Sequence, residues 1–261
     1  MNKSKGKGAA VAAARGGGTG GRTAIQIAVA FVLIALVAGI GIGIAVNHKT
    51  KNSVAGGTAT PTVNAMPPAA GGVTGSITDT GSIRIGKPGA PVSVRVVADL
   101  QCPVCKMFEA ANSATLTDEV NNGTATVDYD ILAFLDRASS GTRYSSRASN
   151  AAYCVATADP TKFQGWLSAM FEAQPPENGK GLDNDKIIQI SQTAGVTDPG
   201  LADCVNSEKY GQFVTKTTQQ VLASGINATP TIFINGKAVP NQQNILFGQD
   251  GLKPLIEAAK P

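Results

Sequence analysis

Residues 92–109 read VSVRVVADLQCPVCKMFE, and this stretch decides the fold. Its first part, Val92–Ala98, is a run of β-branched and apolar residues that is typical of a buried strand. Pro103 suits the first position of a helix, and residues 104–121 contain neither Gly nor Pro before Asn122-Gly123 ends the run. We therefore predict a buried strand that turns directly into a helix, with two cysteines at the junction.

Further elements are predicted on both sides of this strand and helix. Four segments carry the pattern of strands: Ser82–Ile85, Ala125–Leu135, Thr231–Ile234 and Lys237–Val239. Between about 140 and 225 the β pattern is absent and proline-containing breaks separate several short helical stretches. Asn235-Gly236 predicts a hairpin turn, and a last helix is predicted at Gly251–Lys260. The order predicts an α/β sheet interrupted by a helical insertion.

The N-terminal part of the chain predicts a membrane anchor. Residues 24–46 contain no charged side chain, and 23 helical residues cross about 30 Å of hydrocarbon. Five basic residues precede this segment and two lysines follow it closely, so the N-terminus is expected in the cytoplasm. A cleaved signal peptide is the alternative, but the run is long for one and no clear A-x-A site follows. We expect a single-pass protein of the cell membrane, in contact with lipid, whose cysteines are extracytoplasmic.

Composition divides the remainder into a tail, a linker and a folded part. Residues 1–23 predict a basic cytoplasmic tail, and residues 47–80, rich in Gly, Ala, Thr and Pro, predict a disordered linker. Residues 1–52 carry seven of the 22 basic residues and no acid, which leaves 15 basic against 18 acidic residues, a net charge of −3. Because the basic excess belongs to the tail, we expect no nucleic-acid partner.

Cys102 and Cys105 lie where a thiol is chemically activated. The N-terminus of a helix offers unpaired N–H groups and a partial positive charge, and both lower the pKa of a nearby thiol. Cys102 is therefore expected to be an exposed nucleophile. Cys105, one turn further along, is expected to be the resolving thiol that bonds with it. Such a pair exchanges disulfides without a cofactor.

A zinc site is the alternative explanation of a Cys-x-x-Cys pair. Zinc needs four nitrogen, sulfur or carboxylate ligands, commonly including a second closely spaced pair. The other two cysteines, Cys154 and Cys204, are fifty residues apart, and the single histidine is His48, beside the predicted membrane helix. This spacing favours redox chemistry over a metal site.

The dipeptide Thr229-Pro230 directly precedes a predicted strand. A proline at a strand start, after a loop, is compatible with a cis peptide bond, and a plain edge proline is the alternative. A cis turn would bring backbone N–H and C=O groups beside the Cys-x-x-Cys pair, where an extended substrate segment would pair with them. We therefore expect Thr229 and Pro230 to bind substrate.

Two motifs together resemble the DsbA-type branch of the thioredoxin superfamily, particularly anchored members from Gram-positive bacteria. They are ADLQCPVCKMFE at residues 98–109 and ATPTIFING at residues 228–236, and the resemblance extends from Ser82 to the C-terminus. It implies a thioredoxin-like fold over about 81–261 that contains the helical insertion at about 140–225, a cis peptide at Pro230, and recycling by a quinone-coupled membrane oxidase. It also implies that Cys154 and Cys204 form a structural disulfide, for which two free buried thiols are the alternative.

Two positions depart from the family's pattern. Val96, six residues before Cys102, stands where many relatives carry a buried acid that accepts a proton, so water or another group must serve, with Asp99 and Glu109 as weak candidates. The dipeptide between the cysteines is Pro-Val, where the best-known strong oxidases have Pro-His. Without an imidazole the thiolate of Cys102 loses one stabilising group, which predicts a milder oxidant.

The sequence thus predicts an extracytoplasmic thiol:disulfide oxidoreductase that introduces disulfides into reduced secreted or cell-envelope proteins. One alternative is a reductase or isomerase on the same scaffold, with which Thr229 before Pro230 is compatible. Another is a non-catalytic, membrane-tethered binding module in which the Cys-x-x-Cys pair is structural.

Overall fold

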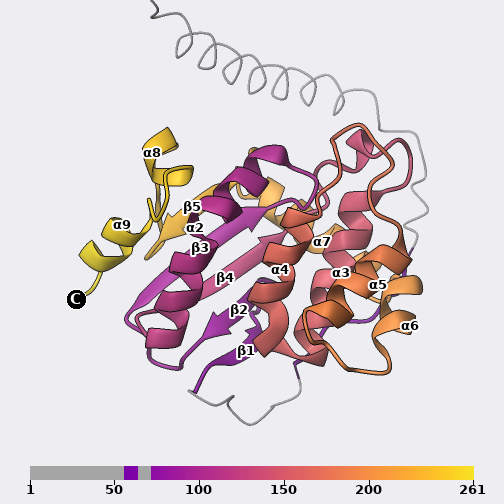
Figure 1. The fold of residues 1–261 in the computed structure, drawn as a ribbon, viewed down its shortest axis with the longest axis horizontal. Helices are drawn as coiled ribbons and strands as arrows, with labels where there is room; N and C mark the ends of the chain where they lie inside the picture. The colour runs from indigo at the N-terminus through magenta and orange to yellow at the C-terminus, as the bar shows by residue number, and fades with distance from the viewer. Residues whose placement is uncertain (1–55, 64–71) are drawn as a thin grey trace, which may run out of the picture. The chain divides into compact units, whose positions relative to one another are not determined.

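The computed structural model describes residues 56–63 and 72–261, and in this part of the chain six strands form a single sheet. The strand order is β1-β2-β4-β3-β5-β6 (Figure 1). β3 runs parallel to β4, and the other neighbouring pairs are antiparallel. The strands are β1 Thr74–Ile77, β2 Ile83–Gly86, β3 Val92–Ala98, β4 Ala125–Ile131, β5 Thr231–Ile234 and β6 Lys237–Ala238.

The predicted central strand is confirmed as β3. It lies between β4 and β5, with Val96 opposite Tyr129 on one side and Ile232 on the other. Its apolar side chains are almost completely buried on both faces of the sheet. A strand covered on both faces reads as a nearly continuous apolar run rather than an alternating one, which is why the sequence signal was strong.

The helix that follows β3 is α2, Pro103–Asn122, and both of its predicted ends are confirmed. Cys102 is its N-cap residue, and Pro103 occupies the first helical position. Gly123 ends it in the left-handed region, with φ 75°, and its N–H reaches the last carbonyls of the helix. Glycine suits this position because it has no Cβ to oppose a positive φ.

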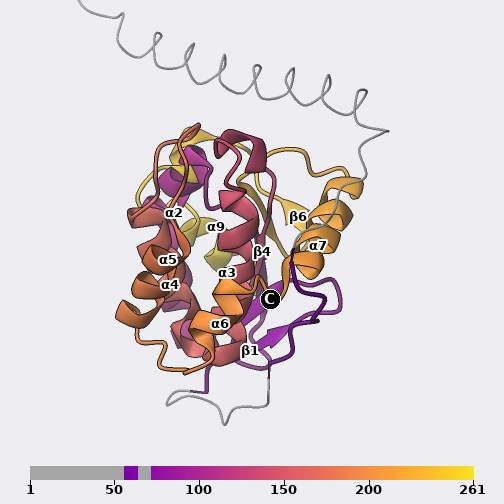
Figure 2. The ribbon, with the colours of Figure 1, turned by 90° about the vertical axis from the view of Figure 1, so that its right-hand side faces the viewer.

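Helices cover both faces of the sheet, as Figures 1 and 2 show. α2 lies on one face and α7, Gly211–Ala223, on the other, where Val221 packs with Val97 and Leu132. Two short C-terminal helices, α8 Gln243–Leu246 and α9 Lys253–Ala258, adjoin α2. The Asn112 side chain of α2 holds them by donating to the carbonyl of Leu246 and accepting from the N–H of Leu252.

The predicted helical insertion is present between β4 and β5. Besides α7 it contains α3 Tyr144–Ala158, α4 Phe163–Glu172, α5 Asn184–Thr193 and α6 Leu201–Asn206, with short 3₁₀ turns at Asp136–Ala138 and Pro160–Lys162. Large aromatic side chains, including Trp166, Tyr153 and Phe163, are fully buried within it. The predicted α/β sheet with a helical insertion is therefore confirmed, and the insertion packs onto the sheet through aromatic contacts such as that of Phe163 with Tyr129 of β4.

The expectation of a disordered linker at residues 47–80 is wrong over two described segments. Residues 74–77 are strand β1, which pairs with β2. Further upstream, the N–H of Gly57 donates to the carbonyl of Glu208 at 2.8 Å, and the carbonyl of Gly57 accepts from Gln212 at 3.1 Å. A Cβ at Gly57 would lie 2.4 Å from the carbonyl oxygen of Lys209, so glycine permits this close approach. These polar, glycine-rich segments are ordered by hydrogen bonds to other folded segments of the chain. The spacing of apolar residues in the sequence does not indicate such bonds.

Two predicted element ends also move. β4 ends at Ile131 rather than Leu135, because the N–H groups of Phe134 and Leu135 donate to the Asp99 carboxylate instead of continuing the ladder. The last helix is shorter than Gly251–Lys260. Among residues 56–63 and 72–261, no helix is both long and apolar enough to cross a bilayer. The predicted tail at 1–23 and membrane helix at 24–46 lie outside the described residues.

Candidate active site

Cys102 and Cys105 are free thiols that lie together at the start of α2. Cys102 is only 4% exposed, so the expectation of an exposed nucleophile is wrong. The carbonyl of Thr229 covers it and accepts a hydrogen bond from its Sγ at 3.4 Å. Cys105 is buried one turn further along the helix. The turn before the helix is closed by the N–H of Cys102, which donates to the carbonyl of Asp99 at 3.0 Å.

The pKa values of the two thiols are shifted in opposite directions. The pKa of Cys102 is lowered, chiefly because the Cys105 thiol donates a hydrogen bond to it; the Thr229 side chain adds to this and burial opposes it. The pKa of Cys105 is raised well above that of an ordinary thiol, chiefly by burial. Cys102 is therefore the thiol that ionises, and Cys105 is the one that keeps its proton and stabilises the neighbouring thiolate.

The loop before β5 brings Thr229 to the cysteines. The Thr229-Pro230 peptide bond is cis, as the family resemblance implied. β5 pairs with β3 so that Thr231 lies opposite Val97, close to the end of the strand that leads to Cys102. Two segments more than 120 residues apart in the sequence thus meet at one end of the sheet.

Asp99 lies in the turn between β3 and Cys102 and is fully buried. One carboxylate oxygen accepts from the N–H of Gln101 and the hydroxyl of Ser145, both at 2.8 Å. The other accepts from the N–H groups of Phe134 and Leu135 at 2.8 and 2.9 Å. Burial raises the pKa of Asp99 to about 6, against these hydrogen bonds. With four donors aimed at it, this carboxylate braces the turn before α2 and has little free capacity to accept a proton.

Glu109 is a second buried acid, one helical turn beyond Cys105. It is 5% exposed, and the hydroxyl of Ser168 donates to its carboxylate at 2.7 Å. Burial raises the pKa of Glu109 to about 7, so the group exchanges its proton near neutral pH. Residues four apart on a helix share a face, which places Glu109 on the same side of α2 as Cys105. Sequence reasoning gave Glu109 little weight because an acidic residue in a helix is usually exposed.

The helical insertion contacts the active-site turn through Gln174, which follows α4. Its side-chain Nε2 donates to the carbonyl of Leu100 at 2.9 Å and to that of Cys102 at 3.0 Å. In return, Nζ of Lys106 in α2 donates to the carbonyl of Glu172 at the end of α4, at 3.0 Å. Sequence reasoning missed Gln174, whose only signal is its place before the break Pro175-Pro176.

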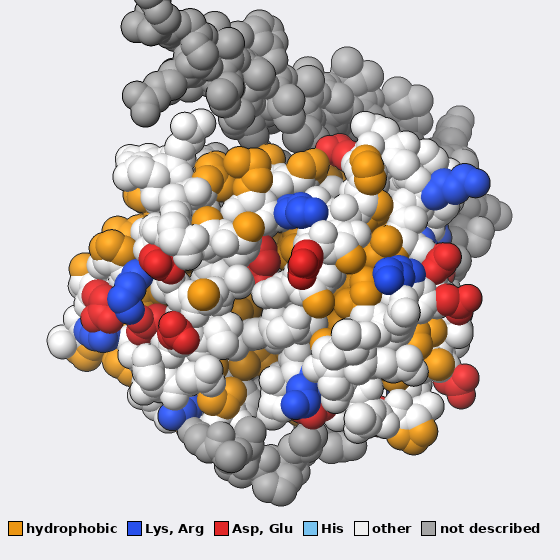
Figure 3. All heavy atoms as spheres, viewed as in Figure 1, with side chains coloured by type: hydrophobic (Ala, Val, Ile, Leu, Met, Phe, Trp, Pro, Cys, Tyr) orange, Lys and Arg blue, Asp and Glu red, His pale blue; other side chains and the backbone are white. Residues whose placement is uncertain are grey.

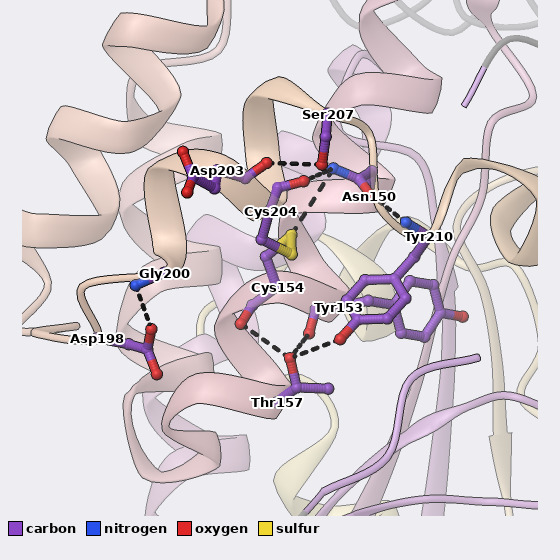
Figure 4. Close-up of a disulfide and its surroundings, with 10 residues drawn as sticks. All are labelled: Asn150, Tyr153, Cys154, Thr157, Asp198, Gly200, Asp203, Cys204, Ser207 and Tyr210. Atoms are coloured by element: carbon purple, nitrogen blue, oxygen red, sulfur yellow. Dashed lines mark hydrogen bonds between the residues drawn. A yellow bond between two sulfur atoms is a disulfide. The ribbon is translucent and has the colours of Figure 1, made fainter. Parts of the chain in front are cut away.

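Cys154 and Cys204 form a disulfide within the insertion, as the resemblance implied. It joins α3 to α6, with 5.9 Å between the two Cα atoms (Figure 4). Beside it, the Asn150 side chain donates to the carbonyl of Cys204 and accepts from the N–H of Tyr210. The Tyr210 hydroxyl in turn lies 3.3 Å from that of Thr157. This second cysteine pair is built into a local hydrogen-bonded network.

Comparison with known proteins places these features in a family. The thioredoxin family profile matches residues 78–257. The serine/threonine-protein kinase PknE of Mycobacterium tuberculosis is 33% identical over 168 residues, which are 61% of this chain and 29% of the kinase, so this chain spans less than a third of that relative's length. Disulfide bond formation protein D of Bacillus subtilis is 25% identical over 187 residues, 71% of this chain and 80% of that protein.

A solved structure matches this chain over nearly its own full length. The reduced form of DsbA from Mycobacterium tuberculosis superposes with a TM-score of 0.55 and 32% sequence identity. The match covers 69% of this chain and 99% of the DsbA chain. The fold, the helix-start cysteine pair and the cis-proline loop agree with these likenesses. The chain therefore belongs to the thioredoxin family, in its DsbA-type branch of thiol:disulfide oxidoreductases.

Proposed function

We propose that this chain is an extracytoplasmic thiol:disulfide oxidoreductase that acts mainly as an oxidase on reduced secreted or cell-envelope proteins. The observation that carries the proposal is the opposite pKa shifts of Cys102 and Cys105 at the start of α2. A lowered pKa stabilises the thiolate of the reduced enzyme, which favours passing the disulfide on to a substrate. The likeness to a protein named for disulfide bond formation supports the same direction.

The reaction begins with the oxidised pair. A substrate thiolate attacks Sγ of Cys102, the bond between Cys102 and Cys105 breaks, and Cys105 leaves as a thiolate that takes up a proton. A mixed disulfide now joins the substrate to Cys102. The substrate's second thiolate then attacks the substrate's own sulfur in this bond and expels Cys102 as a thiolate. The substrate leaves with one disulfide, and the enzyme leaves with the dithiol that the structure contains.

Glu109 fits the role of proton acceptor and donor for Cys105 in this cycle. Cys105 must lose a proton when the pair is reoxidised and gain one when the pair is reduced, because its pKa is high. Glu109 lies on the same face of α2 one turn away, and its pKa of about 7 lets it hold either state at neutral pH. It replaces, from the helix, the acid that Val96 does not supply from the strand.

The substrate surface is proposed around Thr229 and Pro230. An extended substrate segment would pair with the backbone of this loop while its cysteine reaches Cys102. Met107, in the second turn of α2, is 52% exposed and offers an apolar contact for an unfolded chain. Figure 3 shows one face of the molecule, on which hydrophobic side chains reach the surface between scattered charged ones. The apolar contact at Met107 would suit many substrate sequences rather than one.

Anchoring and recycling complete the proposal. Residues 24–46 would hold the enzyme in the cell membrane with its thioredoxin-like part outside, near emerging secreted chains. A quinone-coupled membrane oxidase would accept the two electrons of the Cys102–Cys105 dithiol and restore the disulfide. Both statements rest on the sequence and on the family resemblance.

Two assays of the purified chain test the direction of the reaction. Oxidative refolding of a reduced two-disulfide substrate should be faster than insulin reduction by the same protein, and equilibration with glutathione should give a potential well above thioredoxin's roughly −270 mV. A potential near that value, with efficient insulin reduction, would instead establish the reductase or isomerase alternative. Trapping with Cys105→Ser should capture mixed disulfides whose partners are secreted proteins.

A further inference from the structure

Gln174 belongs to the helical insertion and takes no part in the bond exchange proposed above, yet it holds the residue that does. Its Nε2 donates one hydrogen bond to the carbonyl of Leu100 and one to the carbonyl of Cys102, at 2.9 and 3.0 Å. Both amide hydrogens are therefore engaged on the active-site turn. We infer that Gln174 is a positioning residue that keeps the Cys102 thiol acidic.

The physical reason lies in the carbonyl oxygen of Cys102. This oxygen and Sγ belong to the same residue, so the carbonyl dipole acts on the charge of the ionised sulfur. The N–H of Lys106 donates to this oxygen at a rather long 3.2 Å, and Pro103 has no N–H to offer. The second donor, from Gln174, places the positive end of an N–H dipole against this oxygen and offsets its negative charge. This favours the ionised form of the thiol.

The contact also ties the turn to α4. Lys106 Nζ donates to the carbonyl of Glu172 at 3.0 Å, while Gln174, two residues later, donates in the opposite direction. The start of α2 and the end of α4 are therefore joined by reciprocal hydrogen bonds, and α2 and α4 are in contact with each other. Through Gln174 the insertion acts on the chemistry of Cys102. This inference rests on the proposed function, because it concerns the acidity of the proposed nucleophile.

Two substitutions in the full chain test the inference. Gln174→Met keeps the length of the side chain without its donors, and Gln174→Glu replaces the donors by a carboxylate. The readouts are the pH dependence of Cys102 alkylation by iodoacetamide and the equilibrium constant with glutathione. Loss of the donors should slow alkylation at pH 6 about fivefold, the scale of one hydrogen bond, and move the equilibrium by a similar factor toward the disulfide form. Gln174→Glu should shift both readouts further in the same direction.

Gln164→Met is the matched control. Gln164 lies in α4, the helix that Gln174 follows, and its Nε2 donates to the hydroxyl of Tyr129 at 2.9 Å. This variant should lose similar thermal stability but keep the wild-type alkylation profile. If Gln174→Met lowers the melting temperature as the control does and leaves both readouts at wild-type values, Gln174 is only structural and the inference is overturned. Gln174→Glu decides in the same way where Gln174→Met does not fold.

Two different outcomes distinguish the proposed function from the role of Gln174. A wild-type chain whose Cys102 is alkylated only at the pH of an ordinary thiol, about 8.5, and which exchanges no disulfide would contradict the proposed function itself. A wild-type chain with an acidic, exchanging Cys102 that Gln174→Met and Gln174→Glu leave unchanged would contradict the role of Gln174 alone.

Discussion

The molecule carries two cysteine pairs in very different settings. Cys102 and Cys105 are free thiols with two residues between them, and they lie at the junction of a strand and a helix. Cys154 and Cys204 are separated by 50 residues, join two helices of the insertion and are bonded to each other. Cys102, Cys105 and Cys154 are buried and Cys204 is partly buried, so exposure does not distinguish the two pairs.

What distinguishes the pairs is the surrounding polar structure. The first pair lies at the N-terminus of α2, where the Cys105 thiol, the Thr229 side chain and the backbone N–H of Cys105 lower the pKa of Cys102 and favour a thiolate. The second pair lies within helices whose backbone groups are already bonded, beside the Asn150 side chain that holds the turn after α6. A redox-active pair therefore needs surroundings that stabilise its reduced form, the thiolate and thiol. A structural pair needs surroundings whose hydrogen bonds are complete when the disulfide is formed.

The largest expected effect separates the pairs by activity. Cys102→Ser should lower the rate of oxidative refolding by about 10³-fold or more, because no other group provides the exchanging sulfur. Replacing Cys154 and Cys204 together by Ala should leave the rate within a few-fold of wild type at a temperature where the protein is folded. Refolding assays at 20 °C compare the two variants. Equal losses of activity would break the distinction between the pairs.

The next effect separates them by stability. Removing the Cys154–Cys204 bond frees a loop of about 50 residues in the unfolded chain, which in the chain-entropy model lowers the free energy of unfolding by about 4 kcal/mol. Cys102→Ser should change it by far less. Urea unfolding of the two variants gives the comparison. A double Ala variant as stable as wild type would show that the helices of the insertion are held without their crosslink.

A third effect concerns Glu109, which accompanies only the reactive pair. Its pKa is raised from 4.5 to about 7, so the folded state retains a proton that the unfolded chain releases, and stability falls as pH rises from 4.5 to 7. Glu109→Gln should therefore raise the free energy of unfolding by up to about 3 kcal/mol at pH 8 and leave it nearly unchanged at pH 4. Urea titrations at both pH values test this. An equal gain at pH 4 and pH 8 would contradict the buried-carboxyl explanation.

The smallest effect is a pH-dependent difference in melting temperature between the reduced and the disulfide forms of the Cys102–Cys105 pair. Because the pKa of Cys102 is lowered on folding, its contribution to stability is present above the ordinary thiol pKa and is lost as pH falls through the lowered value. The melting temperature of the reduced protein, relative to the Cys102–Cys105 disulfide form, should thus rise by about 2–4 °C between pH 5 and pH 8. Calorimetry of both forms measures the difference. A difference that falls over this range would show that Cys102 is not the acidic thiol.

Much of this arrangement was predictable because it depends on local rules. The β-branched run Val92–Ala98, the helix start at Pro103 and the stop at Gly123 are written in neighbouring residues, and the structure confirms all three. The pairing of Cys154 with Cys204 came from family resemblance, since four cysteines alone allow several pairings.

The remainder depends on contacts between distant segments. β1 has the sequence TGSI, which lacks an apolar alternation, and it becomes a strand only because β2 offers an edge to pair with. Asp99 is buried because four donors from three separate segments converge on it. Gln174 reaches the carbonyl of Cys102 across 72 positions of sequence. Contacts between residues so far apart in the sequence cannot be predicted from a local sequence pattern.

The docking of Gly57 against the turn after α6 has a consequence for the working radius of the enzyme. With the anchor proposed at residues 24–46, only residues 47–55 separate it from the docked segment that begins at Gly56. Nine residues cannot extend beyond about 30 Å, whatever their conformation. With this anchor, the connecting segment would be much shorter than a linker that ends at residue 80. Substrates would then have to react close to the membrane surface, as they emerge from it.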